Sequence, residues 1–141
     1  MGINRLRGRI PMDVGRCTTL RRVLLKQNKF TGPLPDFERN VNLLYMEISN
    51  NEINGSIPSS LGNCTNITGL MLSTNKLSGR VPPELGRLVN LRTLDFGHNN
   101  LEGPLPFQLS NRTKMYYSLA EICYQLCSQA KQALPIKDSF E

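Results

Sequence analysis

The chain has 141 residues, of which 39% are hydrophobic and 20% are charged, a composition that suits one folded domain and argues against wholesale disorder. No run of about 18 apolar residues occurs, which excludes a membrane-spanning helix, and residues 1–10 lack the apolar segment of a secretory signal peptide. The net charge of +6 would suit an anionic partner. A basic surface without an assigned partner is the simpler interpretation, and we predict no nucleic-acid partner.

The dominant feature of the sequence is a repeat of about 24 residues with the pattern L-x-x-L-x-L-x-x-N-x-L-x-G-x-(I/L/V)-P. A half-repeat covers residues 4–11, and four full copies begin at Leu20, Leu43, Ile67 and Leu91. The repeated asparagines, at positions 4, 28, 51, 75 and 99, are 24, 23, 24 and 24 residues apart, so one coil is a residue short. Chance spacing of leucines in a helical protein would not match eight positions four times.

Each repeated position has a structural role. The L-x-L alternation predicts short parallel strands near residues 22–26, 45–49, 69–73 and 93–97, whose inward aliphatic side chains stack across the coils. The asparagine amide is expected to bond to the backbone of its own and the adjacent coil, and the glycine to take a tight bend or a positive φ. The residues after the proline predict a helical or 3₁₀ turn. The predicted inward column consists of Leu25, Ile48, Leu72 and Phe96.

These roles predict an α/β solenoid, a right-handed superhelix with short parallel strands on its concave face and a helix at its C-terminus. The repeat is expected to break after residue 114, because a further coil would place an asparagine at position 123, where the chain has Cys123. Instead, Ser118 and Glu121 form a capping-box pattern, and the apolar spacing predicts a helix over 119–133. We therefore divide the chain into a repeat array, 1–114, and an atypical helical tail, 115–141. The tail would either cap the last coil or replace its normal sequence.

The G-x-(I/L)-P ending of each repeat resembles the extracellular repeats of plant receptor-like kinases and receptor-like proteins. The segments 56–79 and 103–114 look like the ectodomains of receptor kinases that perceive endogenous danger peptides. The resemblance implies a recognition module for a peptide or protein ligand, with a co-receptor as a further partner, in defence signalling at the extracellular side of the plasma membrane. The signal peptide, membrane helix and kinase of that family are not in this sequence, so we expect a fragment of such a receptor.

The strand residues that lie between the inward aliphatics are predicted to point to the concave face, because side chains alternate along a strand. This surface runs from basic residues at the first coil to Asp95 at the fourth, an order that suits an extended peptide bound in one direction. No strand carries the L-x-R-x-R pattern with which related receptors often hold a peptide C-terminus. The alternative is that these are the solvated residues of any such repeat. The predicted ligand-binding residues are Arg22, Leu24, Lys26, Tyr45, Glu47, Ser49, Met71, Ser73, Thr93, Asp95 and His98.

Four cysteines raise the question of disulfides and metals. Cys17 and Cys64 occupy the same repeat position, two coils or about 10 Å apart, which is too far for a disulfide. We therefore predict buried, unpaired thiols at both positions. Cys123 and Cys127 lie one turn apart on the predicted helix, but zinc usually takes four ligands, so we predict neither a metal nor a cofactor.

Four N-x-S/T sequons are candidate glycosylation sites, at Asn54, Asn63, Asn66 and Asn111. About two would arise by chance, and the excess favours a secretory origin. They agree with the extracellular location that the family resemblance implies.

An enzyme is not expected, because His98 is the only histidine and the sequence has no nucleophile–base arrangement and no phosphate-binding loop. The best interpretation is a non-catalytic recognition module. An intracellular-type protein interaction scaffold and a truncated, non-functional product are the alternatives.

Overall fold

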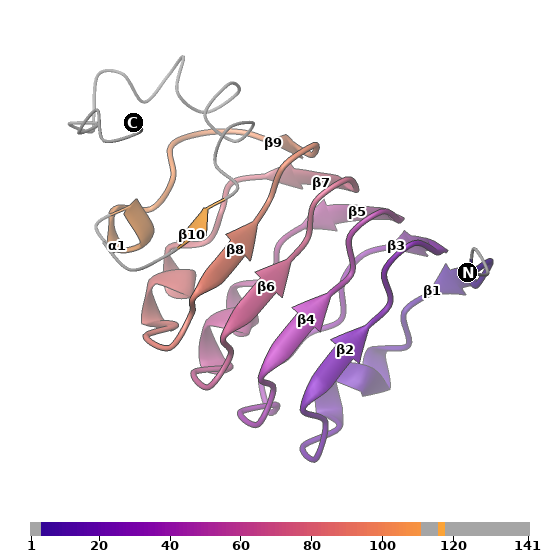
Figure 1. Ribbon diagram of the computed structural model, residues 1–141, viewed down its shortest axis with the longest axis horizontal. Coiled ribbons are helices and arrows are strands. Elements are labelled where there is room, and N and C mark those ends of the chain that lie inside the picture. The colour runs from indigo at the N-terminus through magenta and orange to yellow at the C-terminus, as the bar shows by residue number, and fades with distance from the viewer. Residues whose placement is uncertain (1–3, 111–115, 118–141) are drawn as a thin grey trace.

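The computed structural model describes residues 4–110 and 116–117. In these residues successive coils lie side by side as a solenoid, and each coil supplies short strands to parallel sheets (Figure 1). The first sheet, which we call the concave sheet, has the strand order β10-β8-β6-β4-β2. Its strands are β2 (Arg22–Leu24), β4 (Tyr45–Glu47), β6 (Gly69–Met71), β8 (Thr93–Asp95) and β10 (Tyr116–Tyr117).

The four strands predicted from the L-x-L alternation are confirmed, and each begins at the predicted residue. Each regular strand is three residues long instead of the predicted five. Backbone hydrogen bonds between coils nevertheless continue beyond the strand ends. The N–H of Leu25 donates to the carbonyl of Glu47 at 2.8 Å, and the N–H of Gln27 donates to the carbonyl of Ser49 at 3.0 Å. The backbone between strand and asparagine is therefore paired although it no longer has strand geometry.

A second parallel sheet, which the sequence analysis did not predict, has the strand order β1-β3-β5-β7-β9. It is built from the residues around the N-x-L-x-G part of the repeat. The glycines there have φ between 75° and 92°, which confirms the predicted positive φ at this position, where other residues would be strained. Its strands are β1 (Arg7–Arg9), β3 (Lys29–Gly32), β5 (Glu52–Ser56), β7 (Lys76–Gly79) and β9 (Asn100–Leu101).

Short helical turns follow the prolines, as predicted, because proline at the start fixes φ without removing a helical hydrogen bond. They are η1 (Met12–Arg16), η2 (Ser59–Asn63), η3 (Pro83–Arg87) and the single α-helical turn α1 (Phe107–Ser110). These turns pack on one another through glycine: a Cβ added at Gly62 would collide with the carbonyl of Glu84 in the next coil. The glycine of the P-x-x-L-G segment therefore sets the close spacing between neighbouring coils.

The coil that is one residue short has no helical turn between Pro35 and Asn40. Phe37 fills the position that Leu61 holds in the next coil and is 1% exposed. Asn40 is fully buried, and neither of its side-chain polar atoms has a hydrogen-bond partner in the described part of the chain. Deleting one residue thus removes the turn but keeps a large apolar side chain in the core.

The core is one continuous stack of aliphatic and aromatic side chains between the sheets and the helical turns. The predicted inward column is confirmed: Ile48 and Leu72 are fully buried, Phe96 is 1% exposed, and Leu25 is half-buried against the same cluster. Leu25 is less buried because β2 is the end strand of the concave sheet. Burial of each such side chain contributes about 1.5–3 kcal/mol to the free energy of folding.

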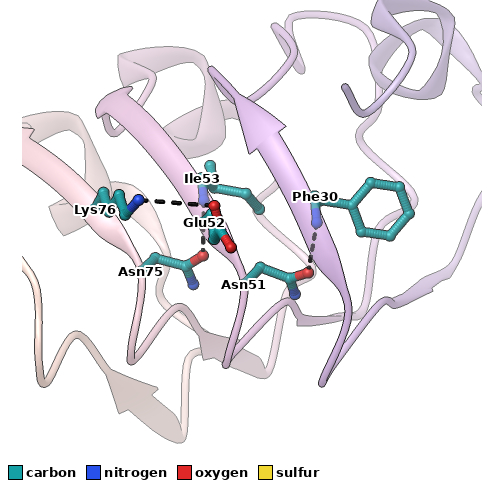
Figure 2. A network of polar contacts seen from close by, with 6 residues as sticks. All are labelled: Phe30, Asn51, Glu52, Ile53, Asn75 and Lys76. Carbon is teal, nitrogen blue, oxygen red and sulfur yellow. Dashed lines mark hydrogen bonds and ion pairs between the residues drawn. The ribbon is translucent and has the colours of Figure 1, made fainter. Parts of the chain in front are cut away.

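The repeated asparagines link neighbouring coils, as predicted (Figure 2). The Asn75 amide nitrogen donates to the carbonyl of Leu72 in its own coil and to that of Ile48 in the preceding coil, at 3.2 and 3.1 Å. The side-chain oxygen of Asn75 accepts a hydrogen bond from the backbone N–H of Ile53 at 3.1 Å. In the same way, the side-chain oxygen of Asn51 accepts one from the backbone N–H of Phe30 at 3.1 Å. Each amide therefore satisfies backbone groups that the turn would otherwise leave buried and unpaired.

A second asparagine ladder, not foreseen from the sequence, stands at the turn before each strand. Asn42, Asn66 and Asn90 are 24 residues apart. Their amide nitrogens donate to carbonyls of the preceding coil, those of Thr18, Val41 and Thr65, at 2.7, 3.0 and 3.0 Å. The recurrence of asparagine every 24 residues was the feature of the sequence that could have predicted this ladder.

The two described cysteines are unpaired, as predicted, but only Cys64 is buried. The prediction of a buried Cys17 is wrong. Cys17 lies in the first described coil, which has a neighbour on one side only, whereas Cys64 is covered by coils on both sides. Burial raises the pKa of the Cys64 thiol from 9.0 to about 11, so this thiol is protonated at neutral pH.

The concave sheet continues beyond the point at which the repeat pattern was expected to break. The backbone of β10 pairs in parallel with β8, with Tyr116 opposite Thr93 and Tyr117 opposite Leu94. The offset is 23 residues rather than 24, which is why extrapolation of the repeat missed this strand. The predicted helix over 119–133 lies outside the described residues.

Candidate functional site

The concave sheet presents two outward rows of side chains, because in each three-residue strand the middle residue points into the core. The parallel register aligns the strands residue by residue from β2 to β8, so the rows run straight across the coils, as the spacing predicts. The first row contains Arg22, Tyr45, Gly69 and Thr93. The second row contains Leu24, Glu47, Met71 and Asp95.

The centre of the first row is an aromatic platform, which we define as Arg22, Tyr45 and Gly69. A Cβ added at Gly69 would collide with the Tyr45 ring, so the ring lies directly on the glycine backbone. The guanidinium carbon of Arg22 stands 5.8 Å from the centroid of the same ring, within the range of a cation–π contact. Tyr45 remains half-buried, which leaves part of its surface open to a ligand.

The second row supplies two carboxylates and two apolar side chains. Glu47 accepts the N–H of Ser49 at 3.2 Å, and Asp95 accepts the N–H of Gly97 at 2.9 Å. Each carboxylate is thereby oriented by the backbone of its own coil, while its second oxygen can still accept from a bound molecule. Leu24 is 60% exposed. The row therefore combines fixed negative charge with accessible apolar surface.

The predicted ligand-binding residues that follow the strand ends, Lys26, Ser49 and Ser73, differ in how accessible they are. Ser49 is 3% exposed and shares a hydrogen bond of 3.1 Å with the hydroxyl of Ser73. Ser49 thus lies below the open surface and supports Ser73, which is half-buried. Lys26, by contrast, is exposed.

The residues that directly precede the repeated asparagines are exposed and form a rim along the concave sheet. Their backbone φ is positive, which the repeat pattern did not predict. Gln27, Asn50, Thr74 and His98 have φ of 57°, 58°, 53° and 51°. Positive φ is uncommon outside glycine and is particularly unfavourable for a β-branched residue such as Thr74. Because positive φ recurs at this position in all four coils, the turn geometry of the coil imposes this conformation. Glycine or asparagine at this position in every coil would have indicated a positive φ from the sequence, but only one coil has such a residue, Asn50.

The described sequons lie away from the concave sheet. Asn54 is exposed on β5 of the second sheet, and Asn63 is half-buried at the end of η2. Asn66 is exposed in the turn before β6, where its amide nitrogen already donates to Val41. Asn111 lies outside the described residues. None of the three described sequon asparagines stands on a strand of the concave sheet.

The fold and the repeated asparagine ladder define a leucine-rich repeat protein. The family model described as Leucine Rich Repeat matches residues 42–64, 66–88 and 90–111. A probable leucine-rich repeat receptor-like serine/threonine-protein kinase of Arabidopsis thaliana is 40% identical over 58 residues, which are 41% of this chain and 6% of that kinase.

Solved structures of plant receptors have the same fold. The structure of PEPR1 with AtPEP1 is 41% identical, with a TM-score of 0.77 over 81% of this chain and 16% of that one. The Arabidopsis receptor kinase HAESA with the peptide hormone IDA and the co-receptor SERK1 is 33% identical, with a TM-score of 0.72 over 80% of this chain and 19% of that one. The repeats of this chain are therefore similar in sequence and in fold to those of plant leucine-rich repeat receptors, and the chain spans less than a fifth of each of these two receptor chains.

The described part of the chain contains no helix long and apolar enough to cross a membrane.

Proposed function

We propose that this chain is a ligand-binding segment of a plant receptor ectodomain at the cell surface, and that its concave sheet holds an extended peptide. The single observation that carries the proposal is the aromatic platform of Arg22, Tyr45 and Gly69, which stands beside the oriented carboxylates of Glu47 and Asp95. Ligand sites in general combine apolar surface with a few fixed polar groups in this way. The proposed role is binding and signalling, not catalysis.

The order of charge across the sheet supports one direction for the peptide. Arg22 and Lys26 are exposed on the first coil, whereas Glu47 and Asp95 lie on the second and fourth coils. Acidic groups or the C-terminal carboxylate of the peptide would lie near Arg22 and Lys26, and its basic residues near Glu47 and Asp95. An apolar or aromatic residue between them would pack on Tyr45 and Met71.

The relatives support the class of ligand. The similar solved structures include PEPR1 with AtPEP1, and HAESA with a peptide hormone and a co-receptor. By analogy, we propose a peptide ligand and a co-receptor as partners of the protein to which these repeats belong. The position of the described sequons, away from the concave rows, is consistent with that use of the sheet.

The test is a screen of a displayed peptide library on the purified chain, followed by calorimetric titration of the enriched peptides. Tyr45→Ala, Met71→Ala and Asp95→Ala should each weaken binding by about tenfold or more, the loss of about 1.4 kcal/mol. Gly69→Ala is a sharper probe, because the added methyl group displaces the Tyr45 ring without removing it.

Arg80→Ala is the control, because Arg80 is exposed and lies outside the concave strands. Circular dichroism of every variant verifies that the fold is retained. The concave site is wrong if no peptide is enriched, or if the concave substitutions weaken binding no more than Arg80→Ala does.

A further inference from the structure

Two carboxylates stand at a fixed separation on the concave sheet. Glu47 on β4 and Asp95 on β8 hold the same place in the second row, and the parallel register puts Met71 of β6 between them. They are therefore two strand spacings apart, about 9.5 Å. Strand β4 lies between β2 and β6, and β8 lies between β6 and β10, so this separation is set inside the sheet and not at its ends.

Both carboxylates are available to the cationic groups of a ligand. Each is half-buried and uses one oxygen to accept a backbone N–H of its own coil, Glu47 from Ser49 and Asp95 from Gly97. The two ion pairs of the described residues involve other carboxylates. The second row therefore presents two oriented negative charges, about 9.5 Å apart, that no described cation pairs with.

The separation selects the conformation of a peptide that crosses the strands. In a β-strand the residues on one face are about 6.7 Å apart, and the next on that face is about 13 Å away, so neither spacing matches. In a polyproline II helix residues three positions apart share a face and are separated by about 9.3 Å. One turn of that helix thus spans two coils of the solenoid.

The surface beside the carboxylates suits the same conformation. Met71 lies between the two charges, and Tyr45 of the first row is half-buried, so both present apolar surface to the intervening residues of a ligand. Aromatic side chains line the grooves in which polyproline II segments bind. The guanidinium of Arg22, 5.8 Å from the centroid of the Tyr45 ring, repels ligand cations from the first row and directs them to the second.

We propose that the ligand is a polyproline II segment with two basic residues three positions apart, one bound by Glu47 and the other by Asp95. The two residues between them pass over Met71, with one turned toward Tyr45. This inference rests on the proposed function, because it specifies the peptide that the same concave site binds.

The experiment compares three synthetic peptides, each with two lysines in a polyproline chain of one fixed length. The lysines are two, three or four positions apart, so the peptides share their composition, charge and conformation and differ only in spacing. Chemical-shift titrations of the isotopically labelled chain measure the three affinities. The peptide with a spacing of three should bind about fivefold more tightly, because in the others the two lysines point to different faces and only one of them reaches a carboxylate.

Variants of the chain test which groups read the spacing. Glu47→Gln or Asp95→Asn should bind all three peptides equally, because the remaining carboxylate can hold one lysine at any spacing. A merely structural role would instead weaken all three and keep their order. Glu102→Gln is the matched control, since it removes the same charge from an exposed residue outside the concave strands and should leave the preference unchanged.

A further peptide tests the conformation. Replacing the spacer prolines by glycine keeps the charge and the spacing of three but removes the preformed helix, so it should bind about threefold or more weakly. Equal binding of the three spacings, tighter binding of another spacing, a preference that survives in both carboxylate variants, equal binding of the glycine peptide, or no binding at all would each overturn the proposal.

Failure of this inference is distinguishable from failure of the proposed function. If the library screen enriches peptides whose binding depends on Tyr45 but which lack basic residues three positions apart, the spacing is wrong and the concave site stands. If the screen enriches nothing, the concave site itself is wrong. Circular dichroism verifies the fold of each variant before its affinities are compared.

Discussion

The first coil and the inner coils of this solenoid carry the same sequence pattern but differ in how well that pattern is buried. In the inner coils Ile48 and Leu72 are fully buried, whereas the equivalent Leu25 of the first coil is half-buried. Cys64 is buried and Cys17 is exposed, although both hold the same repeat position. A repeat therefore does not bury its own core: the coils on either side do.

The polar ladder shows the same contrast. Asn75 bonds to carbonyls of its own and the preceding coil, but the amide nitrogen of Asn28 reaches only Leu25 and Lys26 within its own coil, at 3.0 and 3.2 Å. The loss of stability that a substitution causes should consequently depend on the place of its coil in the array more than on the type of residue replaced. Four substitution pairs test this comparison, from the largest expected effect to the smallest.

The core column should give the largest difference. Leu72→Ala should lower the free energy of unfolding by about 2–5 kcal/mol, because it opens a cavity in a fully buried layer. Leu25→Ala, at the same position of the first coil, should cost about 1 kcal/mol, since this side chain is only partly covered. Urea denaturation followed by circular dichroism measures both values. Equal losses would show that the first coil is as well packed as the third.

The asparagine ladder should give the next difference. Asn75→Ala removes bonds to the carbonyls of Ile48 and Leu72 and leaves the buried N–H of Ile53 without its acceptor, at an expected cost of about 3 kcal/mol. Asn28→Ala should cost about 1 kcal/mol, because its bonds are partly open to water. Thermal unfolding of the two variants gives the comparison, and a greater loss for Asn28→Ala would contradict it.

The cysteines extend the comparison to pH. Because burial raises the pKa of Cys64 from 9.0 to about 11, the folded state retains its proton longer than the unfolded chain does. This contribution, about 2–3 kcal/mol, is fully present below pH 9 and is lost as the pH rises through 11. Cys64→Val should therefore reduce the alkaline loss of stability, and Cys17→Val, at the exposed equivalent position, is the comparison variant. Identical pH profiles for Cys64→Val and the wild type between pH 8 and 11 would refute this effect.

Backbone strain at the rim should give the smallest effect. Thr74→Asn should stabilise the chain by about 0.5–1 kcal/mol, because asparagine tolerates the φ of 53° better than a β-branched residue does. Gln27→Asn in the first coil should give a smaller gain in stability, since glutamine is not β-branched and its coil is covered on one side only. Differential scanning calorimetry would measure both shifts, and a loss of stability in Thr74→Asn would show that its side chain has a structural role.

Much of the fold followed from the repeat, because each repeated residue acts through local geometry. The L-x-L alternation placed the starts of β2, β4, β6 and β8, and the asparagine and glycine positions predicted the amide bonds and the positive φ. The second sheet was not predicted, since its pairing depends on how closely the coils stack. Strand β10 was missed because its register is offset by 23 residues from β8.

The candidate site was only partly predictable. Strand alternation placed the outward rows that contain Tyr45, Met71 and Asp95, because period two fixes the face of each side chain. Alternation does not give the depth of a side chain, so Ser49 was assigned to the open surface although it is buried beside Ser73. The predicted ligand-binding roles of these residues remain a prediction for the titrations above.

The sequence alone determined the period, the class of fold and the residues that face inward, because these depend on spacing along a single coil. Tertiary structure decided what spacing cannot specify: which copies of a position are buried, and where the Tyr45 ring rests. The physical reason is that burial and contact in a solenoid are properties of neighbouring coils, and a coil with one neighbour buries less than the same coil with two.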